Sequence, residues 1–242
     1  MKINFYPPSK QANGNFNFGE IVEKKPIGFP QDGGQLKPFS NLFYWAHAWT
    51  TGKRSTIGLH PHQGFEICTF VLRGSINHFD TKLNKWVRLD EGDVQIIRSG
   101  NGISHSEEIL ENSEIFQIWF DPDLSKSLKK PASYNDYKID EFKFTDSDDH
   151  MIRHIHNKKS KMWMDSEDIV INEYFFDKFS SVNIKIENDK IHSFFLIDGE
   201  VSLKKFKFNK GDFFTISNVR NIDVVALKSA KLFEVSSPIK PS

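Results

Sequence analysis

The sequence predicts an all-β protein built as two tandem antiparallel β-barrels. Short runs rich in β-branched and aromatic residues alternate with turn signals from residue 57 to 121, and again from residue 151 onward. Helical periodicity is almost absent from both stretches. The second half also repeats the pattern of the first. A chain of 242 residues can form one large domain or two small ones, and the repeat favours two.

The composition excludes several classes of protein. Lys+Arg and Asp+Glu both number 32, so the near-zero net charge gives no broad basic surface for nucleic acid or an anionic membrane. No apolar run approaches the roughly 20 residues that span a bilayer, and residues 1–10 lack the apolar segment of a signal peptide. The single cysteine, Cys68, allows no intramolecular disulfide. This suits a reducing cytoplasm, which is the expected location.

The elements of the first half follow from local patterns. Residues 1–40, rich in Pro, Gly and Lys, are expected to form irregular arms and short strands. Residues 42–46 give the first strong strand, and residues 67–72 give another that closes at the Arg73-Gly74 turn. The last strand of this half covers residues 115–120, before Asp121-Pro122.

A change of pattern marks the domain boundary. Residues 121–149 carry a polar Ser/Lys-rich stretch and an acidic cluster, which indicate an exposed connection with a helical turn. Strand patterns then return. We therefore expect a metal-binding barrel over residues 1–125, a linker over 126–150, and a second barrel, lacking the metal ligands, over 151–242.

An internal repeat relates the two halves. Residues 70–76 resemble 195–201, and residues 91–94 resemble 210–213; in each half a strand, a turn glycine and a second strand precede a Gly-Asp turn. The first half carries four polar residues that stand out: His60, His62, His105 and Glu107. Counted from the turn glycines, their counterparts are Lys185, Glu187, Val224 and Ala226. The four polar residues are therefore not needed merely to build a barrel.

These four residues form two close pairs with the spacing of metal ligands. His60 and His62 lie two apart before one strand, and His105 and Glu107 lie two apart before another. Residues two apart on a strand point to the same face. Three imidazoles and a carboxylate can thus converge on one metal ion and leave coordination positions open. Such ligands suit Fe(II), although Ni, Cu, Mn or Zn would accept them. The alternative is a set of ordinary buried histidines.

The two motifs resemble those of the cupin superfamily. His60, His62, Glu66 and Gly74 match its first motif, and residues 100–105 match its second, with Gly100 in place of Pro. Within the cupins, His-Pro-His-Gln-Gly-Phe-Glu and Gly-Asn-Gly-Ile-Ser-His-Ser-Glu are similar to the pirin family, specifically over about residues 57–121. The resemblance implies a bicupin with one metal, usually iron, in the N-terminal barrel. Its implied ligands are His60, His62, His105 and Glu107.

Other residues near the motifs are candidates for supporting roles. Glu66 would face the same way as the histidines on a regular strand, and we expect it to orient a ligand or accept a proton rather than to coordinate. His78 is expected at the surface or in a pocket wall. Four aromatic residues are candidates for a pocket lining, although core packing would explain each equally well: Phe43, Trp45, Phe65 and Phe116.

The resemblance implies two alternative functions. The first is a metal-dependent dioxygenase that opens flavonols such as quercetin with O2, with Glu107 or Glu66 accepting the substrate proton. The second is a non-enzymatic, iron-binding and redox-responsive regulator that docks on a transcription factor or a metabolic enzyme. The neutral charge argues against direct DNA binding but not against a protein partner. A substrate-sized cavity over the metal would favour the enzyme, which is the function we expect.

Overall fold

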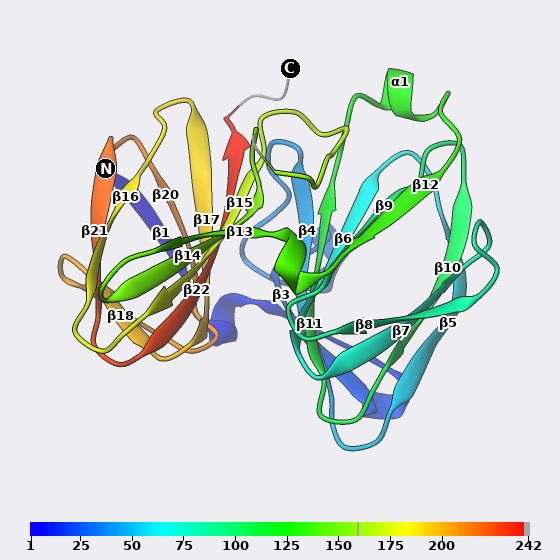
Figure 1. The fold of residues 1–242 in the computed structure, drawn as a ribbon, viewed down its shortest axis with the longest axis horizontal. Helices are drawn as coiled ribbons and strands as arrows, with labels where there is room; N and C mark the ends of the chain where they lie inside the picture. The colour runs from blue at the N-terminus through cyan, green and yellow to red at the C-terminus, as the bar shows by residue number, and fades with distance from the viewer. Residues whose placement is uncertain (159, 240–242) are drawn as a thin grey trace. The chain divides into compact units, whose positions relative to one another are not determined.

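The computed structural model describes residues 1–158 and 160–239 and is almost entirely β-structure, as predicted. Its contacts divide the chain into two compact units (Figure 1). The first unit consists of residues 10–141 and 164–167. The second consists of residues 1–9, 142–158, 160–163 and 168–239.

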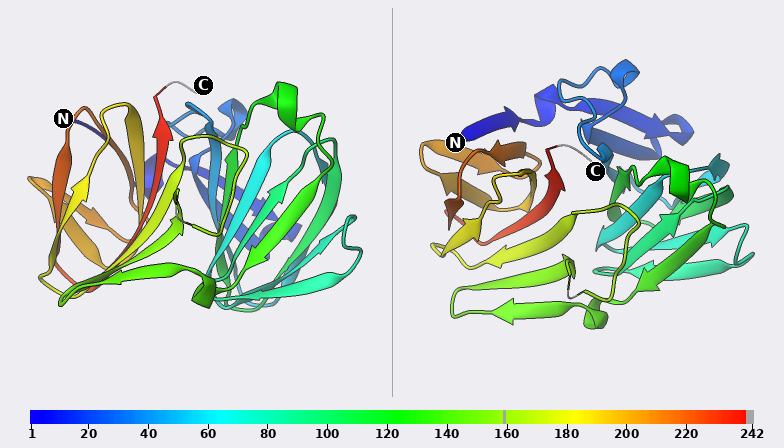
Figure 2. Two further views of the ribbon diagram at one scale, coloured as in Figure 1. Left: turned by 45° about the horizontal axis from the view of Figure 1, so that its top comes forward. Right: turned by 90° about the horizontal axis from the view of Figure 1, so that it is seen from above.

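The first unit contains two antiparallel sheets, and Figure 2 shows them from two further sides. The larger sheet has the order β12 (Ser133–Tyr137), β9 (Val94–Arg98), β6 (Glu66–Arg73), β11 (Glu114–Phe120), β4 (Leu42–Thr50), β3 (Ile21–Ile27) and β2 (Ala12–Phe16). The smaller sheet has the order β5 (Ser55–His62), β10 (Ile103–Ile109), β7 (Ser75–Asp80) and β8 (Trp86–Asp90).

The second unit repeats this arrangement strand for strand. Its larger sheet has the order β1 (Lys2–Tyr6), β20 (Phe213–Ser217), β17 (Lys190–Asp198), β22 (Ala230–Pro238), β15 (Val170–Phe176), β14 (His150–His156) and β13 (Lys143–Asp146). Its smaller sheet has the order β16 (Ser181–Lys185), β21 (Asn221–Ala226), β18 (Glu200–Leu203) and β19 (Phe206–Asn209). The internal repeat in the sequence thus corresponds to a repeated sheet topology.

The helices are short. Residues 1–158 and 160–239 contain one α-helical turn, α1 (Leu124–Ser127), and four 3-10 turns: η1 (Pro8–Lys10), η2 (Asn17–Gly19), η3 (Pro30–Asp32) and η4 (Ile139–Glu141). Within the described part of the chain, no helix has the length and apolar character needed to cross a membrane.

Some strands near the predicted domain boundaries and at the start of the chain pair with strands far away in the sequence. β12 lies within the expected linker 126–150 and pairs with β9 of the first unit. β13 pairs with β14, and β1, at the start of the chain, pairs with β20 of the second unit. A strand of five residues carries no local signal of its partner, so this exchange of an edge strand has no counterpart in the sequence pattern. The boundaries at 125/126 and 150/151 stay predictions.

The strand register corrects the counterparts of the four polar residues. Ile109 pairs with Ile76, and Ala226 pairs with Val201; each partner lies two residues after its turn glycine, so Ala226 matches Ile109. Following the ladders from this point gives the true counterparts: Ile184 for His60, Ile186 for His62, Ile222 for His105 and Val224 for Glu107. The positions counted from the glycines were wrong because the connections between strands differ in length between the halves.

Candidate metal centre

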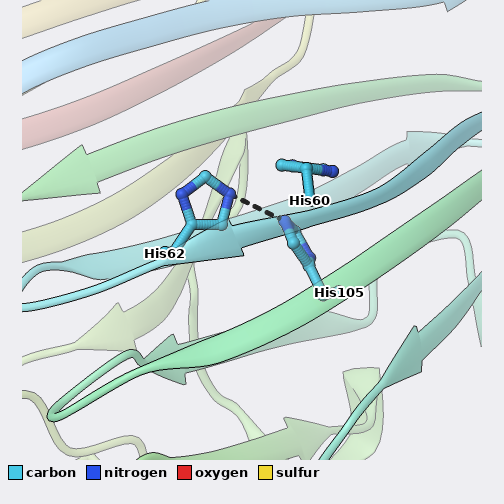
Figure 3. A group of neighbouring side chains, drawn as sticks. All are labelled: His60, His62 and His105. Atoms are coloured by element: carbon cyan, nitrogen blue, oxygen red, sulfur yellow. Dashed lines mark hydrogen bonds between the residues drawn. The ribbon is translucent and has the colours of Figure 1, made fainter.

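The neighbouring strands β5 and β10 bring three histidines together. His60 lies directly opposite His105, and His62 lies opposite Ile103. The Nε2 atoms of His62 and His105 are 3.1 Å apart, and the ring centroids of His60 and His105 are 4.5 Å apart. One ligand atom from each histidine lies within 4.8 Å of the others. Figure 3 shows the three imidazoles gathered where the two strands run side by side.

A β-bulge separates this cluster from Glu107. The register of β5 against β10 shifts between His105 and Glu107, so that Gly58 and Leu59 together oppose Ser106. A bulge re-aims the side chains on either side of it. Ser106 Oγ donates a hydrogen bond to the carbonyl of Ile57 at 2.7 Å and fixes the distorted segment.

Glu107 is fully buried and held in one orientation. Its carboxylate accepts hydrogen bonds from Thr69 Oγ1 at 3.2 Å and from Gln117 Nε2 at 2.6 Å. Trp119 Nε1 donates to Gln117 Oε1 at 3.1 Å, which turns the amide nitrogen of Gln117 toward Glu107. The carboxylate lines the same cavity as His60 and His62.

Two of the histidines, His62 and His105, have the charge state that metal binding requires. Burial, and after it the neighbouring imidazoles, lower the pKa of both His62 and His105 to about 3, so both rings are neutral at pH 7. Neutral imidazole is the form that ligates a metal. Two nitrogens about 2.1 Å from one ion and at right angles lie about 3 Å apart, which matches the His62–His105 separation. The donor set therefore fits a divalent cation.

His78 lies beside this cluster and was not predicted there. It is fully buried rather than at the surface, and its side chain belongs to a second close group with His105 and Glu107. Its Nε2–H donates to Asp80 Oδ2 at 3.0 Å, and Asp80 Oδ1 accepts the backbone N–H groups of Lys82 and Leu83, both at 2.7 Å. This chain of bonds fixes the His78 ring against His105, 5.6 Å away between centroids. The position of His78 follows from the register between β7 and β10, which places His78 opposite Glu107 and Asp80 opposite His105. Knowledge of this register would have been needed to predict it.

The structure does not bring Glu66 to the histidines. The turn at Gly64, with φ of +90°, breaks the alternation between β5 and β6. Thr69 contacts Glu107, so Glu66, three residues earlier on β6, points to the opposite face of the sheet. There its carboxylate accepts the backbone N–H groups of Asp165 at 2.7 Å and Ser166 at 2.8 Å, while burial raises its pKa. Glu66 therefore holds the segment 164–167 in place and does not orient a metal ligand.

A cavity of about 390 Å³ opens in front of His60, His62 and Glu107. Tyr44 and Trp119 stack along its wall at 4.4 Å, and Trp119 lies 5.2 Å from the His62 ring. Most of the other lining side chains are apolar: Phe16, Phe29, Ala46, Ala48, Ile57, Ile109 and Ile115.

The four aromatic candidates for the pocket divide into two pairs. Phe65 packs on His62 at 5.2 Å, and Phe43 packs on Phe65 at 5.3 Å. Trp45 and Phe116 pack on each other at 5.4 Å in the core and do not line the cavity. None of the four candidates lines the cavity. Its aromatic walls are Phe16, Phe29, Tyr44 and Trp119, which the sequence did not single out.

Comparison with solved structures identifies the fold. The Escherichia coli pirin YhhW, solved in complex with nickel(II), has a TM-score of 0.82 at 18% identity, with 98% of this chain and 99% of that chain covered. The Bacillus subtilis oxalate decarboxylase OxdC has a TM-score of 0.67 at 12% identity, with 98% and 78% covered. The predicted bicupin fold is confirmed.

Sequence comparisons relate part of the chain to one family. The pirin family model matches residues 21–120. The quercetin 2,3-dioxygenase of Escherichia coli is 41% identical over 69 residues, which is 27% of this chain and 29% of that protein. A pirin-like protein of Caulobacter vibrioides is 48% identical over 65 residues, 26% of this chain and 28% of that protein. These matches span less than a third of either relative's length. The chain resembles the pirin family over residues 21–120, and this is the family that its motifs predicted.

Proposed function

We propose that this chain binds one divalent metal ion and uses it to open flavonols such as quercetin with O2. His60, His62, His105 and Glu107 would hold the ion, with Fe(II) as the expected metal and Ni, Cu, Mn or Zn as alternatives. One observation carries the proposal: three imidazoles have converging nitrogens, and two of them, His60 and His62, line a largely apolar cavity of about 390 Å³ together with the buried carboxylate of Glu107. Relatives named quercetin 2,3-dioxygenase support the choice of reaction.

The residues around the site have distinct tasks in this reaction. The bound ion supplies Lewis acidity that eases ionisation of the substrate hydroxyl and redox capacity toward O2. Glu107 accepts the hydroxyl proton at Oε1, where the hydrogen bond from Thr69 is the longer of its two. Gln117 keeps the carboxylate in place through Oε2. The position of Glu66 on the opposite face of its sheet leaves Glu107 as the proton acceptor in this proposal.

The cavity walls bind the rings and exclude water. Tyr44 and Trp119 offer stacked aromatic faces next to His62, which suits a flat polyphenol. Apolar side chains around them keep the reacting atoms dry. A concave, apolar site of this kind favours an enzyme over an iron-binding regulator that docks on a protein partner, because docking needs no internal cavity.

The test combines metal analysis with a turnover assay. Freshly purified protein should contain about one metal per chain, and the quercetin absorbance should fall under air but not anaerobically. His60→Ala/His62→Ala should abolish both metal and turnover. Iron-loaded protein that turns over none of several flavonols would reject the dioxygenase, and a pull-down for a protein partner would then test the regulator. Equal turnover by the metal-free double variant would reject the site.

A further inference from the structure

The cavity has a second polar group besides the metal centre. Glu23 and Lys25 from β3 and Tyr44 from β4 contribute to its lining. Lys25 Nζ lies 3.0 Å from Glu23 Oε1, and the Tyr44 hydroxyl donates to Glu23 Oε2 at 3.3 Å. The side chains of Glu23 and Lys25 are only 5% and 12% exposed. We name Glu23, Lys25 and Tyr44 the distal polar group.

The glycine at position 14 leaves space for the Glu23 carboxylate. A Cβ atom at Gly14 of β2 would lie 2.0 Å from Glu23 Oε1, so any other residue at position 14 would displace the carboxylate. Burying an ion pair beside an apolar cavity costs free energy that an apolar wall would not. The proposed metal binding and proton transfer assign no role to the Glu23–Lys25 pair. A role in binding the substrate would explain why charged groups line this part of the cavity.

The charges of the distal polar group define what it can bind. Lys25 Nζ also lies 3.4 Å from Asp32 Oδ2, so two carboxylates surround one ammonium and the local charge is negative. The hydrogen bond from Tyr44 to Glu23 is longer than the usual O–H···O distance, so Glu23 Oε2 is only weakly engaged. Such a site favours a ligand group that donates a hydrogen bond, such as a phenolic hydroxyl, and disfavours a carboxylate.

Aromatic rings connect the distal polar group to the metal centre. Tyr44 stacks on Trp119, and Trp119 contacts His62. We propose that Glu23, Lys25 and Tyr44 recognise hydroxyl groups on the end of the substrate remote from its metal-chelating group. The inference rests on the proposed function, and it restricts the substrates to neutral, polyhydroxylated flat aromatic molecules.

The experiment compares two flavonols that share the same chelating pair, the 3-hydroxyl and the neighbouring carbonyl. Quercetin carries hydroxyls on its outer rings, whereas 3-hydroxyflavone has the chelating hydroxyl and carbonyl alone. Binding of each to metal-loaded protein is measured anaerobically by the shift of the ligand absorbance. Wild-type protein should bind quercetin at least about tenfold more tightly, because a hydrogen bond to a buried charged group is at stake.

Matched variants separate recognition from folding. Glu23→Gln should weaken quercetin binding to near the level of 3-hydroxyflavone and leave 3-hydroxyflavone binding unchanged, and Gly14→Ala should do the same by displacing Glu23. The control is Lys24→Met on the same strand, because Lys24 Nζ donates to Asn13 Oδ1 and does not line the cavity. A selectivity ratio unchanged in folded Glu23→Gln and Gly14→Ala would overturn the inference alone. Failure of wild-type protein to bind either flavonol would overturn the proposed function and the inference with it.

Discussion

The two units share one sheet topology but differ in what fills their interiors. The first unit carries His60, His62, His105 and Glu107 at ladder positions where the second carries Ile184, Ile186, Ile222 and Val224. All four aliphatic residues are buried in the apolar core of the second unit. The β5–β10 bulge is also absent from the corresponding β16–β21 pairing. The scaffold therefore folds without the polar residues, and their presence in one unit indicates a site.

The same comparison explains the cavity. Gln117 of the first unit is flanked on neighbouring strands by two small residues, Ala46 and Thr69. Its counterpart Glu234 is flanked by Asn172 and Phe194. Small side chains thus leave room in the first unit where larger ones occupy it in the second.

The polar groups of the two interiors also differ in their partners. Glu234 accepts hydrogen bonds from Tyr174 at 2.6 Å and Asn172 at 3.0 Å, and it lies 2.6 Å from His192 Nδ1. This network is internally satisfied, and Phe208 stacks on Phe214 at 3.9 Å in the adjoining core. Glu107 instead shares a cavity with His60 and His62. A polar interior becomes a binding site only where space is left beside it.

The largest effect is expected when residues in the interior of the first unit are replaced by their counterparts from the second. His60→Ile/His62→Ile should reduce metal content from about one per chain to nearly zero and abolish oxygen-dependent flavonol turnover. The fold should persist, because isoleucine occupies both equivalent positions of the second unit. Elemental analysis, circular dichroism and the quercetin assay would measure these three outcomes. A tight metal ion that survives the double substitution would place the metal elsewhere in the chain.

A second comparison sets Glu66 against Glu107, two buried glutamates of the first unit. Glu107→Val, which copies Val224, should weaken metal affinity by more than the roughly 10–100-fold typical of residues that only support a ligand. Glu66→Gln should leave metal affinity unchanged and lower the free energy of unfolding by about 1–3 kcal/mol, because Glu66 holds two backbone N–H groups. Metal titration and denaturant unfolding separate the effects. Metal loss in Glu66→Gln with retention in Glu107→Val would reverse the assignment.

These cases show what the sequence could predict. The His60/His62 and His105/Glu107 pairs are local, so spacing along a strand was enough to select them as candidate ligands. The orientation of Glu66 depends on the turn at Gly64, and the proximity of His78 depends on the register between strands.

The distal polar group could not be predicted from the sequence, because its formation also depends on how strands pair. It is formed by the β3–β4 pairing, inside a region expected to be partly irregular. The geometry of turns such as the one at Gly64 and the register between strands are set by tertiary packing. A local sequence pattern does not encode this packing.

A further substitution fills the cavity of the first unit with a side chain that occupies the equivalent position of the second unit. Ala48 corresponds to Tyr174, since each pairs with the matching residue of the last strand, Ile115 or Leu232. Ala48→Tyr should weaken quercetin binding at least about tenfold, or about 1.4 kcal/mol, while metal content stays unchanged. Anaerobic ligand titration and elemental analysis test this. Ile139→Ala, at an exposed position of η4, is the control. Unchanged affinity in a folded Ala48→Tyr protein would mean that flavonols bind outside the cavity.

The smallest expected effect concerns the stability of the metal-free protein in acid. Burial lowers the pKa of His105 from 6.5 to about 3 in the folded chain, so between these values the unfolded chain binds a proton that the native chain does not. Stability must then fall as the pH drops below about 6.5, whereas the equivalent Ile222 contributes no such dependence. Between pH 7 and 5.5, wild type should lose about 1 kcal/mol more than His105→Ile, or about 3 °C in melting temperature. Thermal melts of both chelator-treated proteins at the two pH values measure the difference. Parallel pH profiles would mean that the native chain protonates His105 as readily as the unfolded chain does, which would contradict the buried, neutral imidazole on which metal binding depends.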